Sequence, residues 1–226
     1  MGQKVNPRGF RVGVTEGWDS QWFAGNKKDV ARYIKEDNSI REVINTKHKD
    51  GGISVVRIAR TTAETTVTIH ASRPGVLIGQ KGAGIEAIKK NLKPVVSDTT
   101  KLNITIKEIK APDIDPTVVA QTIATQLEKR GSYKHAMKQA MQRALKGGAK
   151  GIKVMVGGRL GGAEIARSEF YKQGRLPLHT IRSDIKYGTA TARSQAGAIG
   201  IKVWIYYGEI LGKRPLVEIE RKGGNN

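Results

Sequence analysis

The chain contains no cysteine, which excludes disulfide bonds, thiolate metal ligands and cysteine nucleophiles. Aromatic residues make up only 5% of its 226 positions, so few side chains can stack on nucleic-acid bases. No apolar run reaches the length of a membrane-spanning helix, and the N-terminus has no apolar signal core. Acidic residues are also scarce, since 20 Asp and Glu stand against 40 Lys and Arg. The net charge of +20 favours a polyanionic partner, and nucleic acid fits better than a membrane surface.

Motifs for catalysis are missing as well. The glycine-rich stretch 157–162 is not followed by the Gly-Lys-Ser/Thr of a P-loop, and no Gly-x-Ser-x-Gly elbow occurs. Glu164 and Glu169 could flank a sugar, but neighbouring cations on the same predicted strand favour ion pairing. The four histidines lack the spacing of metal ligands: His48, His70, His135 and His179. We therefore expect no enzymatic activity, no metal and no cofactor.

A short glycine loop carries the first positive signal. Its residues, the candidate RNA-binding loop of a KH domain, are Gly79, Gln80, Lys81 and Gly82. Two glycines framing a cation let the backbone approach a sugar-phosphate chain closely, because no Cβ intervenes. Residues 76–78 before the loop are predicted to form one buried turn, and Ile85, Ile88 and Leu92 follow at helical spacing. The alternative is a corner between two helices in which the glycines serve packing alone.

The segment from residue 20 to residue 111 has the element order αββααβ, which predicts a type II KH domain. The predicted elements are a helix over 27–46 with a break near Asn38, strands over 53–60 and 64–71, a turn and helix around the glycine loop, and a strand over 102–106. The glycine loop therefore lies between a strand pair and the last strand. That context separates it from a chance pair of glycines.

A second domain is predicted over residues 112–211. Pro112 and Pro116 interrupt the strand pattern, and Asp115 with Pro116 resembles an N-cap followed by the first residue of a helix. The predicted elements are helices over 117–130 and 133–145, then strands over 152–156, 164–172, 179–187 and 200–207. Two helices on one face of a four-stranded, mostly antiparallel sheet give an α+β sandwich. Residues 1–19 are predicted to form a basic N-terminal arm and residues 212–226 a short basic tail.

The helix over 133–145 has the clearest amphipathic pattern of the chain. One half is apolar: Ala136, Met137, Ala140, Met141, Ala144 and Leu145. The other half is polar and contains no acid: Lys134, His135, Lys138, Gln139, Gln142, Arg143 and Lys146. A merely solvated helix face usually mixes Glu with Lys, because such pairs stabilise the helix. This pattern favours a phosphate-facing surface over the alternative of a Lys-rich solubility surface.

The glycine-rich stretch 157–162 joins two predicted strands and allows two interpretations. It could be a flexible turn that contacts phosphate through Arg159, or a hairpin loop that only needs glycine backbone angles. The aromatic residues Trp18, Trp22 and Phe23 are more typical of core or docking anchors than of platforms for bases. Recognition of RNA shape and backbone is therefore favoured over sequence readout.

Five stretches resemble one family, the third protein of the small ribosomal subunit in its bacterial form. They are residues 2–7 with Phe10 and Arg11, the loop segment 73–82, the decapeptide 158–167, residues 174–180, and residues 199–205 with Gly208 and Glu209. The decapeptide is highly specific, whereas the glycine loop alone is not. The resemblance extends over nearly the whole chain.

The resemblance implies a structural, non-enzymatic RNA-binding protein in the head of the small subunit. It implies contacts with small-subunit ribosomal RNA and neighbouring head proteins, and a position beside the channel through which messenger RNA enters. It places the protein on ribosomes of the bacterial cytoplasm, or of an organelle of bacterial descent. The predicted messenger-facing residues are Lys134, His135, Lys138, Arg143 and Lys146. The predicted ribosomal RNA contacts are Lys4, Arg8, Arg11, Arg159, Arg167 and Arg175.

Three residues depart from the pattern of that family. Lys134 and His135 stand where an arginine pair is common, and Gln80 replaces the usual first lysine of the glycine loop. Lysine lacks the planar fork that grips phosphate, so a weaker hold on the message is expected at the helix. In the glycine loop, Lys81 is left as the only charge. The alternative function is a free-standing KH-type RNA chaperone or regulator. It would explain the loop and the charge but not the second domain.

The charge excess predicts a steep salt dependence of RNA binding. Between about 50 and about 200 mM salt, the affinity of the chain for structured small-subunit RNA should fall by about 10³-fold, because bound cations displace condensed counterions. Filter binding across a salt series measures the slope, with sucrose additions at constant ionic strength as the control. A flat response would contradict an interface dominated by phosphates.

Overall fold

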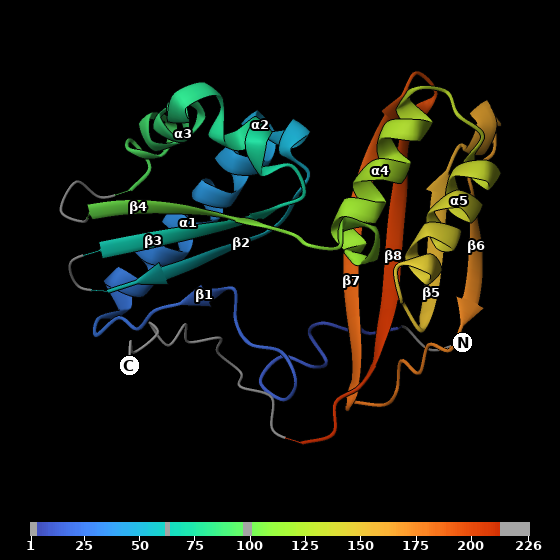
Figure 1. Ribbon diagram of the computed structural model, residues 1–226, viewed down its shortest axis with the longest axis horizontal. Helices are drawn as coiled ribbons and strands as arrows, with labels where there is room; N and C mark the ends of the chain where they lie inside the picture. Colours follow the sequence, from blue (N-terminus) through green and yellow to red (C-terminus); the bar gives the residue numbers. More distant parts are fainter. Residues whose placement is uncertain (1–3, 62–63, 97–100, 213–226) are drawn as a thin grey trace.

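The computed structural model describes residues 4–61, 64–96 and 101–212, and it shows two units that each combine helices with a sheet (Figure 1). Residues 1–3 and nearly all of the predicted basic tail, residues 213–226, lie outside the described ranges. A 3-10 turn, Pro112–Ile114, lies between the last strand of the first sheet and the first helix of the second unit.

The first unit has the predicted αββααβ order, preceded by one additional short strand. Its elements are β1 (Ser20–Gln21), α1 (Lys27–Lys47), a 3-10 turn (Lys49–Gly51), β2 (Ile53–Arg60), β3 (Glu64–Ala71), α2 (Pro74–Ile78), a 3-10 turn (Gln80–Gly82), α3 (Ala83–Leu92) and β4 (Lys101–Glu108). The sheet order is β1-β2-β3-β4, with β2 and β3 antiparallel and both outer pairs parallel. Ile40 and Ile44 of α1 and Ile88 of α3 are buried in the same cluster as Val67 and Ile69 of β3.

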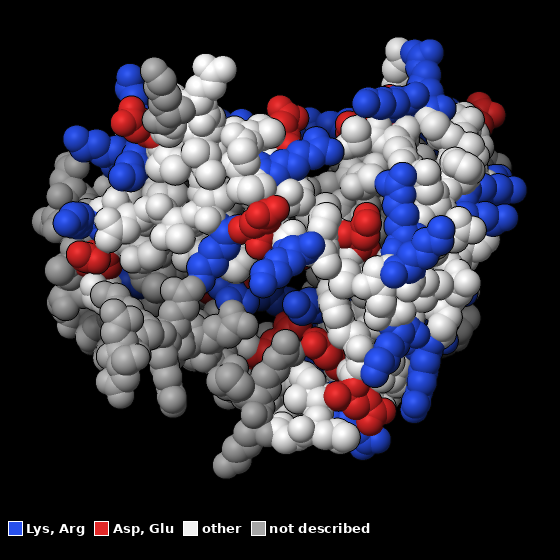
Figure 2. All heavy atoms as spheres, viewed as in Figure 1, with Lys and Arg blue, Asp and Glu red and all other residues white. Residues whose placement is uncertain are grey.

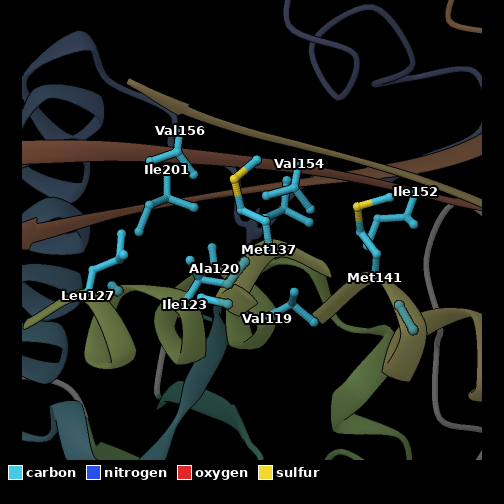
Figure 3. Packing of buried hydrophobic residues seen from close by; sticks show 14 of the residues in the cluster. Val119, Ala120, Ile123, Leu127, Met137, Met141, Ile152, Val154, Val156 and Ile201 are labelled. Atoms are coloured by element: carbon cyan, nitrogen blue, oxygen red, sulfur yellow. The ribbon is translucent and has the colours of Figure 1, made fainter. Parts of the chain in front are cut away.

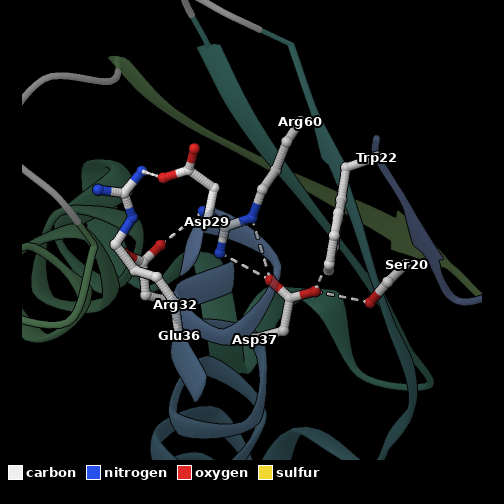
Figure 4. A network of polar contacts seen from close by, with 7 residues as sticks. All are labelled: Ser20, Trp22, Asp29, Arg32, Glu36, Asp37 and Arg60. Atoms are coloured by element: carbon white, nitrogen blue, oxygen red, sulfur yellow. Dashed lines mark hydrogen bonds and ion pairs between the residues drawn. The ribbon is translucent and has the colours of Figure 1, made fainter. Parts of the chain in front are cut away.

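The predicted break in the first helix is wrong, because α1 continues through Asn38 to Lys47. The burial of Asp37, next to Asn38, explains this continuity. One Oδ of Asp37 accepts hydrogen bonds from Ser20 (2.7 Å) and Trp22 (2.8 Å), and the other pairs with Arg60 (2.7 Å) (Figure 4). These bonds fix β1 and the indole of Trp22 against the middle of the helix. Ile34 of the same helix is 58% exposed.

The second unit is the predicted two-helix sandwich. Its elements are α4 (Pro116–Glu128), α5 (Tyr133–Lys146), β5 (Gly151–Gly158), a 3-10 turn (Leu160–Gly162), β6 (Arg167–Gly174), β7 (Ser183–Ser194) and β8 (Gly197–Glu209). The strand order is β6-β5-β8-β7, and every neighbouring pair is antiparallel. Both helices cover the same face of this sheet (Figure 1).

The boundaries of two strands differ from the prediction. β6 begins at Arg167 rather than at residue 164, and β7 runs over Ser183–Ser194 rather than over residues 179–187. The residues between β6 and β7 form a loop because Leu176, only 8% exposed, packs with Ile185 and Tyr206 in a small separate core. Because of that packing, β7 begins at Ser183 and not at residue 179, where the strand-like sequence pattern begins.

The core of the second unit lies between the helices and the sheet. Met137 and Met141 of α5 and Ile123 of α4 pack against Val154 of β5 and Ile201 of β8 (Figure 3). Alternate residues of each strand share a face, so every second side chain enters this core. The apolar half predicted for α5 is confirmed, since its alanines and methionines are buried or half-buried.

Asp115 performs two tasks at the boundary between the units. Its Oδ1 accepts hydrogen bonds from the backbone N–H groups of Thr117 (3.0 Å) and Val118 (3.2 Å), which confirms the predicted N-cap of α4. Its Oδ2 accepts a bond from Ser54 of β2 (2.6 Å). Gln121, one turn further along α4, donates to the carbonyl oxygen of Ile53 (2.9 Å). The start of α4 is thereby attached to the first sheet.

Loss of this carboxylate should destabilise the protein. We expect Asp115→Ala to lower the free energy of unfolding by about 2 kcal/mol, because the helix loses its cap and Ser54 loses its acceptor. Asp115→Asn keeps an oxygen acceptor and should lose much less. Urea denaturation measures both, with Asp113→Ala as the control because Asp113 is exposed on the adjacent turn. Equal losses for Asp115→Ala and Asp113→Ala would refute the role of the cap.

Candidate nucleic-acid interface

The outward half of α5 forms a continuous basic surface. We name it the α5 basic face, and its exposed residues are Lys134, His135, Lys138, Gln142, Arg143 and Lys146. Figure 2 shows Lys and Arg side chains gathered over this part of the molecule. The apolar half of the same helix is held in the core, so the orientation of the basic face is fixed by packing. The structure thus brings the predicted messenger-facing residues together.

The distribution of charge along α5 is not the one that stabilises a helix. Arg143 and Lys146 lie in the last turn, where the helix dipole favours cations, but Lys134 and His135 lie in the first turn, where it favours acids. No acid occupies that first turn, and the N-cap Ser132 makes no capping bond through its side chain. A cation at this end, Lys134, costs helix stability, so its placement favours binding of an external anion.

Arg167 extends the basic surface at the start of α5. Its Nε lies 3.2 Å from Oε1 of Glu169, and that oxygen accepts a bond from the hydroxyl of Tyr133 (3.0 Å). The hydrogen bond to Tyr133 and the nearby carboxylate raise the pKa of Arg167. The ion pairing predicted for this strand is confirmed at Glu169, whereas Glu164 lies exposed in the preceding loop. Tyr133 was missed by the sequence patterns, which showed only an aromatic residue at a helix start.

The glycine loop has the backbone geometry that its sequence indicates. Gly79 has a φ of +67° and Gly82 a φ of +85°, and both values disfavour any residue with a Cβ. A Cβ on Gly84 would lie 2.2 Å from the carbonyl oxygen of Leu77, so α2 and α3 meet at closest approach there. Glycine is thus needed for packing as well as for an accessible loop. Gln80 is exposed, and the side chain of Lys81 lies outside the described part of the structure.

The turn before the loop is not buried as predicted. Leu77 is 2% exposed, but its neighbours Val76 and Ile78 are 58% and 37% exposed. The single turn of α2 directs only one of three consecutive side chains toward the core, because successive residues on a helix point about 100° apart.

The α5 basic face and the glycine loop belong to different units and form separate surfaces (Figure 1).

Arg11, predicted to contact ribosomal RNA, is completely buried. Its guanidinium donates to four carbonyl oxygens, those of Pro7 (2.9 Å), Leu178 (3.0 Å), Thr180 (2.8 Å) and Ser183 (2.7 Å). With its donors engaged inside the protein, Arg11 has no group to offer to phosphate. The prediction for this residue is therefore wrong. The N-terminal segment is correspondingly packed on the second unit rather than extended as an arm.

The remaining predicted contacts differ in accessibility. Lys4 is exposed, and Arg175 is 74% exposed at 4.0 Å from Glu209. Arg8 is held by Glu16 (3.3 Å) and Asp19 (2.5 Å), which neutralise much of its charge.

Arg159 donates to the carbonyl oxygens of Ala163 (2.9 Å) and Ala196 (3.2 Å), so it ties the glycine-rich turn to the turn between β7 and β8. Gly158, Gly161 and Gly162 of that turn have positive φ values. The hairpin interpretation of residues 157–162 accounts for both observations without a phosphate.

Within the described ranges, no helix combines the length and the apolar character needed to cross a bilayer.

Comparison with known proteins agrees with this division of the chain. Residues 38–114 match the KH domain family, and residues 123–205 match the family described as ribosomal protein S3, C-terminal domain. The small ribosomal subunit protein uS3 of Caldicellulosiruptor bescii is 52% identical over 225 residues, with 100% of both chains covered. The chain belongs to the uS3 family.

Further relatives have the same name. The uS3 proteins of Gluconobacter oxydans and Brevibacillus brevis are 51% and 48% identical, covering 98% and 99% of this chain and 96% and 100% of their own. This uS3 protein is therefore a structural, RNA-binding protein of a bacterial-type small ribosomal subunit and not an enzyme. The resemblance noted in the sequence is confirmed over the full chain.

The burial of Arg11 predicts a defect of folding rather than of binding. Arg11→Lys keeps the charge but cannot serve four acceptors, so the free energy of unfolding should fall by about 3 kcal/mol. Urea denaturation measures the loss, with Arg175→Lys as the exposed control. A variant of unchanged stability that binds RNA more weakly would restore Arg11 as an RNA contact.

Proposed function

We propose that this uS3 protein binds small-subunit ribosomal RNA in the head of the subunit and lines the messenger RNA channel with its α5 basic face. The observation that carries the second part is the acid-free surface of α5, whose cations include Lys134 in the unfavourable first turn. Arg167, beside Tyr133, continues this surface onto β6. The messenger strand would thus meet cations supplied by two elements of one rigid unit.

The chemistry of this face suits a moving strand. Cations on exposed side chains neutralise phosphates whatever the base sequence, so a message can slide past without being read. Lys134 and Lys138 act as compact point charges rather than bidentate forks, which favours weak and rapidly exchanged contacts. Such contacts help to hold single strands apart at the channel, and no nucleotide hydrolysis by this chain is required.

Contacts with neighbouring head proteins form a second part of the proposal. Phe23 is 93% exposed and Trp18 is 69% exposed, although both are large and apolar. Aromatic side chains of this kind are frequent anchors of protein interfaces. Their position near the start of the first unit leaves the α5 basic face free.

The ribosome to which this protein belongs would be the cytoplasmic ribosome of a bacterium.

A free-standing KH regulator, the alternative function from the sequence, would need the glycine loop alone, and the match to uS3 proteins over the full chain disfavours it. The two functions differ in where the protein resides. A uS3 protein should co-sediment with small subunits through a wash at high salt, whereas a regulator should be released into the supernatant. Because the assay uses the untagged full chain, added charge cannot influence the outcome.

Reversal of charge on α5 should impair translation of structured messages. Ribosomes reconstituted with Lys134→Glu, Lys138→Glu and Arg143→Glu together should translate a message with a stable hairpin several-fold more slowly, because three phosphate contacts become repulsive. An unstructured message should be translated at the normal rate. The measurement is the time to full-length product in a purified translation system.

The matched control reverses three exposed lysines of α1, by Lys27→Glu, Lys28→Glu and Lys35→Glu. It changes the net charge by the same amount on the other unit. Normal translation of the hairpin message by the α5 variant, or an equal defect in both variants, would refute the role of the α5 basic face.

A further inference from the structure

The sheet of the second unit has one face that α4 and α5 do not cover. Ile152, Val154 and Val156 of β5 are buried beneath the helices, so Lys153 and Met155 between them point to the opposite side. Figure 1 views the sheet with the helices in front, and this second face is on the far side. It is separated from the α5 basic face by the whole core of the unit.

Side chains on this second face form rows that run across all four strands. The pairing of the strands gives a first row of Tyr187, Trp204, Lys153 and Lys172, and a second row of Thr189, Lys202, Met155 and Phe170. A third row contains only small residues: Thr191, Gly200, Gly157 and Ser168. We name these three rows the open face. They combine aromatic and cationic residues, and none is acidic.

A lysine lies between two aromatic rings at the centre of the open face. The Nζ of Lys153 is 4.8 Å from the ring centroid of Phe170 and 5.1 Å from that of Trp204. Trp204 in turn contacts Tyr187, with ring centroids 5.3 Å apart. Phe170 is 61% exposed, which is costly for a phenyl ring unless something covers it. The aromatic group is thus accessible to a flat partner.

The open face collects positive charge without compensation from its own residues. Lys172 is paired with Lys153 across β6 and β5, and Lys202 lies in the next row. Burial, together with the charges of Lys4 and Lys172, lowers the pKa of Lys153. Neighbouring lysines that repel one another at a fixed site are stabilised by an anion. The exposed Arg193 of β7 adds a further cation beyond the third row.

The opposite end of the same sheet face is closed, which holds Trp204 in place. Leu176 and Leu178, from the loop between β6 and β7, pack with Ile185, Tyr206 and Trp204 in the small separate core. Trp204 is consequently supported along one edge and accessible from the other. A ring fixed in this way loses little conformational entropy when a partner stacks on it.

Charge and shape together select the partner. A second copy of this chain, or another basic protein, would be repelled by three lysines and met by no acid. A stiff duplex would offer phosphates but would keep its bases away from the rings. Unpaired nucleotides supply both groups, phosphates for the lysines and flat bases for the aromatic rings. The small third row leaves the sheet backbone accessible beside them.

We propose that the open face is a second RNA-binding surface, which holds unpaired nucleotides by stacking on Phe170 and Trp204 and by phosphate contacts to Lys153, Lys172 and Lys202. It faces away from α5, so one unit would contact RNA on two opposite sides. The surface does not depend on the messenger channel assigned to α5.

Binding of a labelled oligouridylate of about ten nucleotides to the full chain tests this surface. Phe170→Ala should weaken binding about tenfold with an unchanged salt slope, because the lost contact is stacking. Lys202→Glu should weaken binding and lower the salt slope by about one or two, because a phosphate contact is lost. Ile165→Ala, which removes an 82% exposed apolar side chain outside the sheet, is the matched control. Thermal unfolding verifies that each variant is folded.

Two further measurements separate this surface from its alternatives. Oligonucleotides containing 4-thiouridine should cross-link to peptides with Phe170 or Trp204, and the Phe170→Ala effect should persist when Lys134, Lys138 and Arg143 are reversed to Glu. Equal affinity of Phe170→Ala and Ile165→Ala, or cross-links confined to α5 and the glycine loop, would overturn the proposal. In assembled subunits, cross-links from the open face that reach only proteins and no RNA would also overturn the proposal. A translation defect of the α5 variant with no effect of Phe170→Ala would refute this surface and leave the messenger channel intact.

Discussion

The guanidinium of Arg11 lies in the interior, where four backbone carbonyl oxygens accept its hydrogen bonds. Loss of water lowers the pKa of Arg11, and the charges of Glu16 and Asp184 act in the opposite direction. The N-terminal segment is thereby fixed to the second unit. A few residues later, Ser20 and Trp22 bind Asp37 of the first unit. The relative placement of the two units depends on this short bridging segment together with the bonds of Asp115 and Gln121 to β2.

Because acidic residues are scarce in this chain, their positions in the fold determine which surfaces lack negative charge. Five acids hold separate parts of the fold together: Asp37 pairs with Arg60, Asp115 caps α4, Glu128 accepts from the backbone of Arg193, Glu169 binds Tyr133, and Glu209 pairs with Arg182. Each of these contacts joins separate elements or ends a helix. Neither the α5 basic face nor the open face contains an acid, so a stable fold and two acid-free faces coexist in one chain.

Local patterns predicted most of the helices and strands. The predictions that were wrong concern residues whose surroundings are set by contacts with distant parts of the chain. The amphipathic period of α5 and the cap at Asp115 are encoded in neighbouring residues, so both could be found in the sequence. Arg11 stands among glycine, asparagine and proline, a composition typical of an exposed arm, and the carbonyls that bury it come mainly from residues near 180. The late start of β7 likewise results from Leu176 packing on Ile185. The aromatic and cationic rows of the open face exist only through strand pairing, which no local pattern shows.

The two proposed RNA surfaces of the second unit differ in chemistry in a way that suits different tasks. The α5 basic face has long, flexible cations, and the aromatic residue beside it, Tyr133, is bound to Glu169. Contacts of that kind are weak individually and allow a strand to move. The open face adds rings that are held by packing, so a stacked base would stay in register. Because a rigid core joins the two faces, RNA held on one side would fix the orientation of the cations on the other. Anchoring to immobile RNA and contact with a moving message then become consequences of a single sheet with different residues on its two sides.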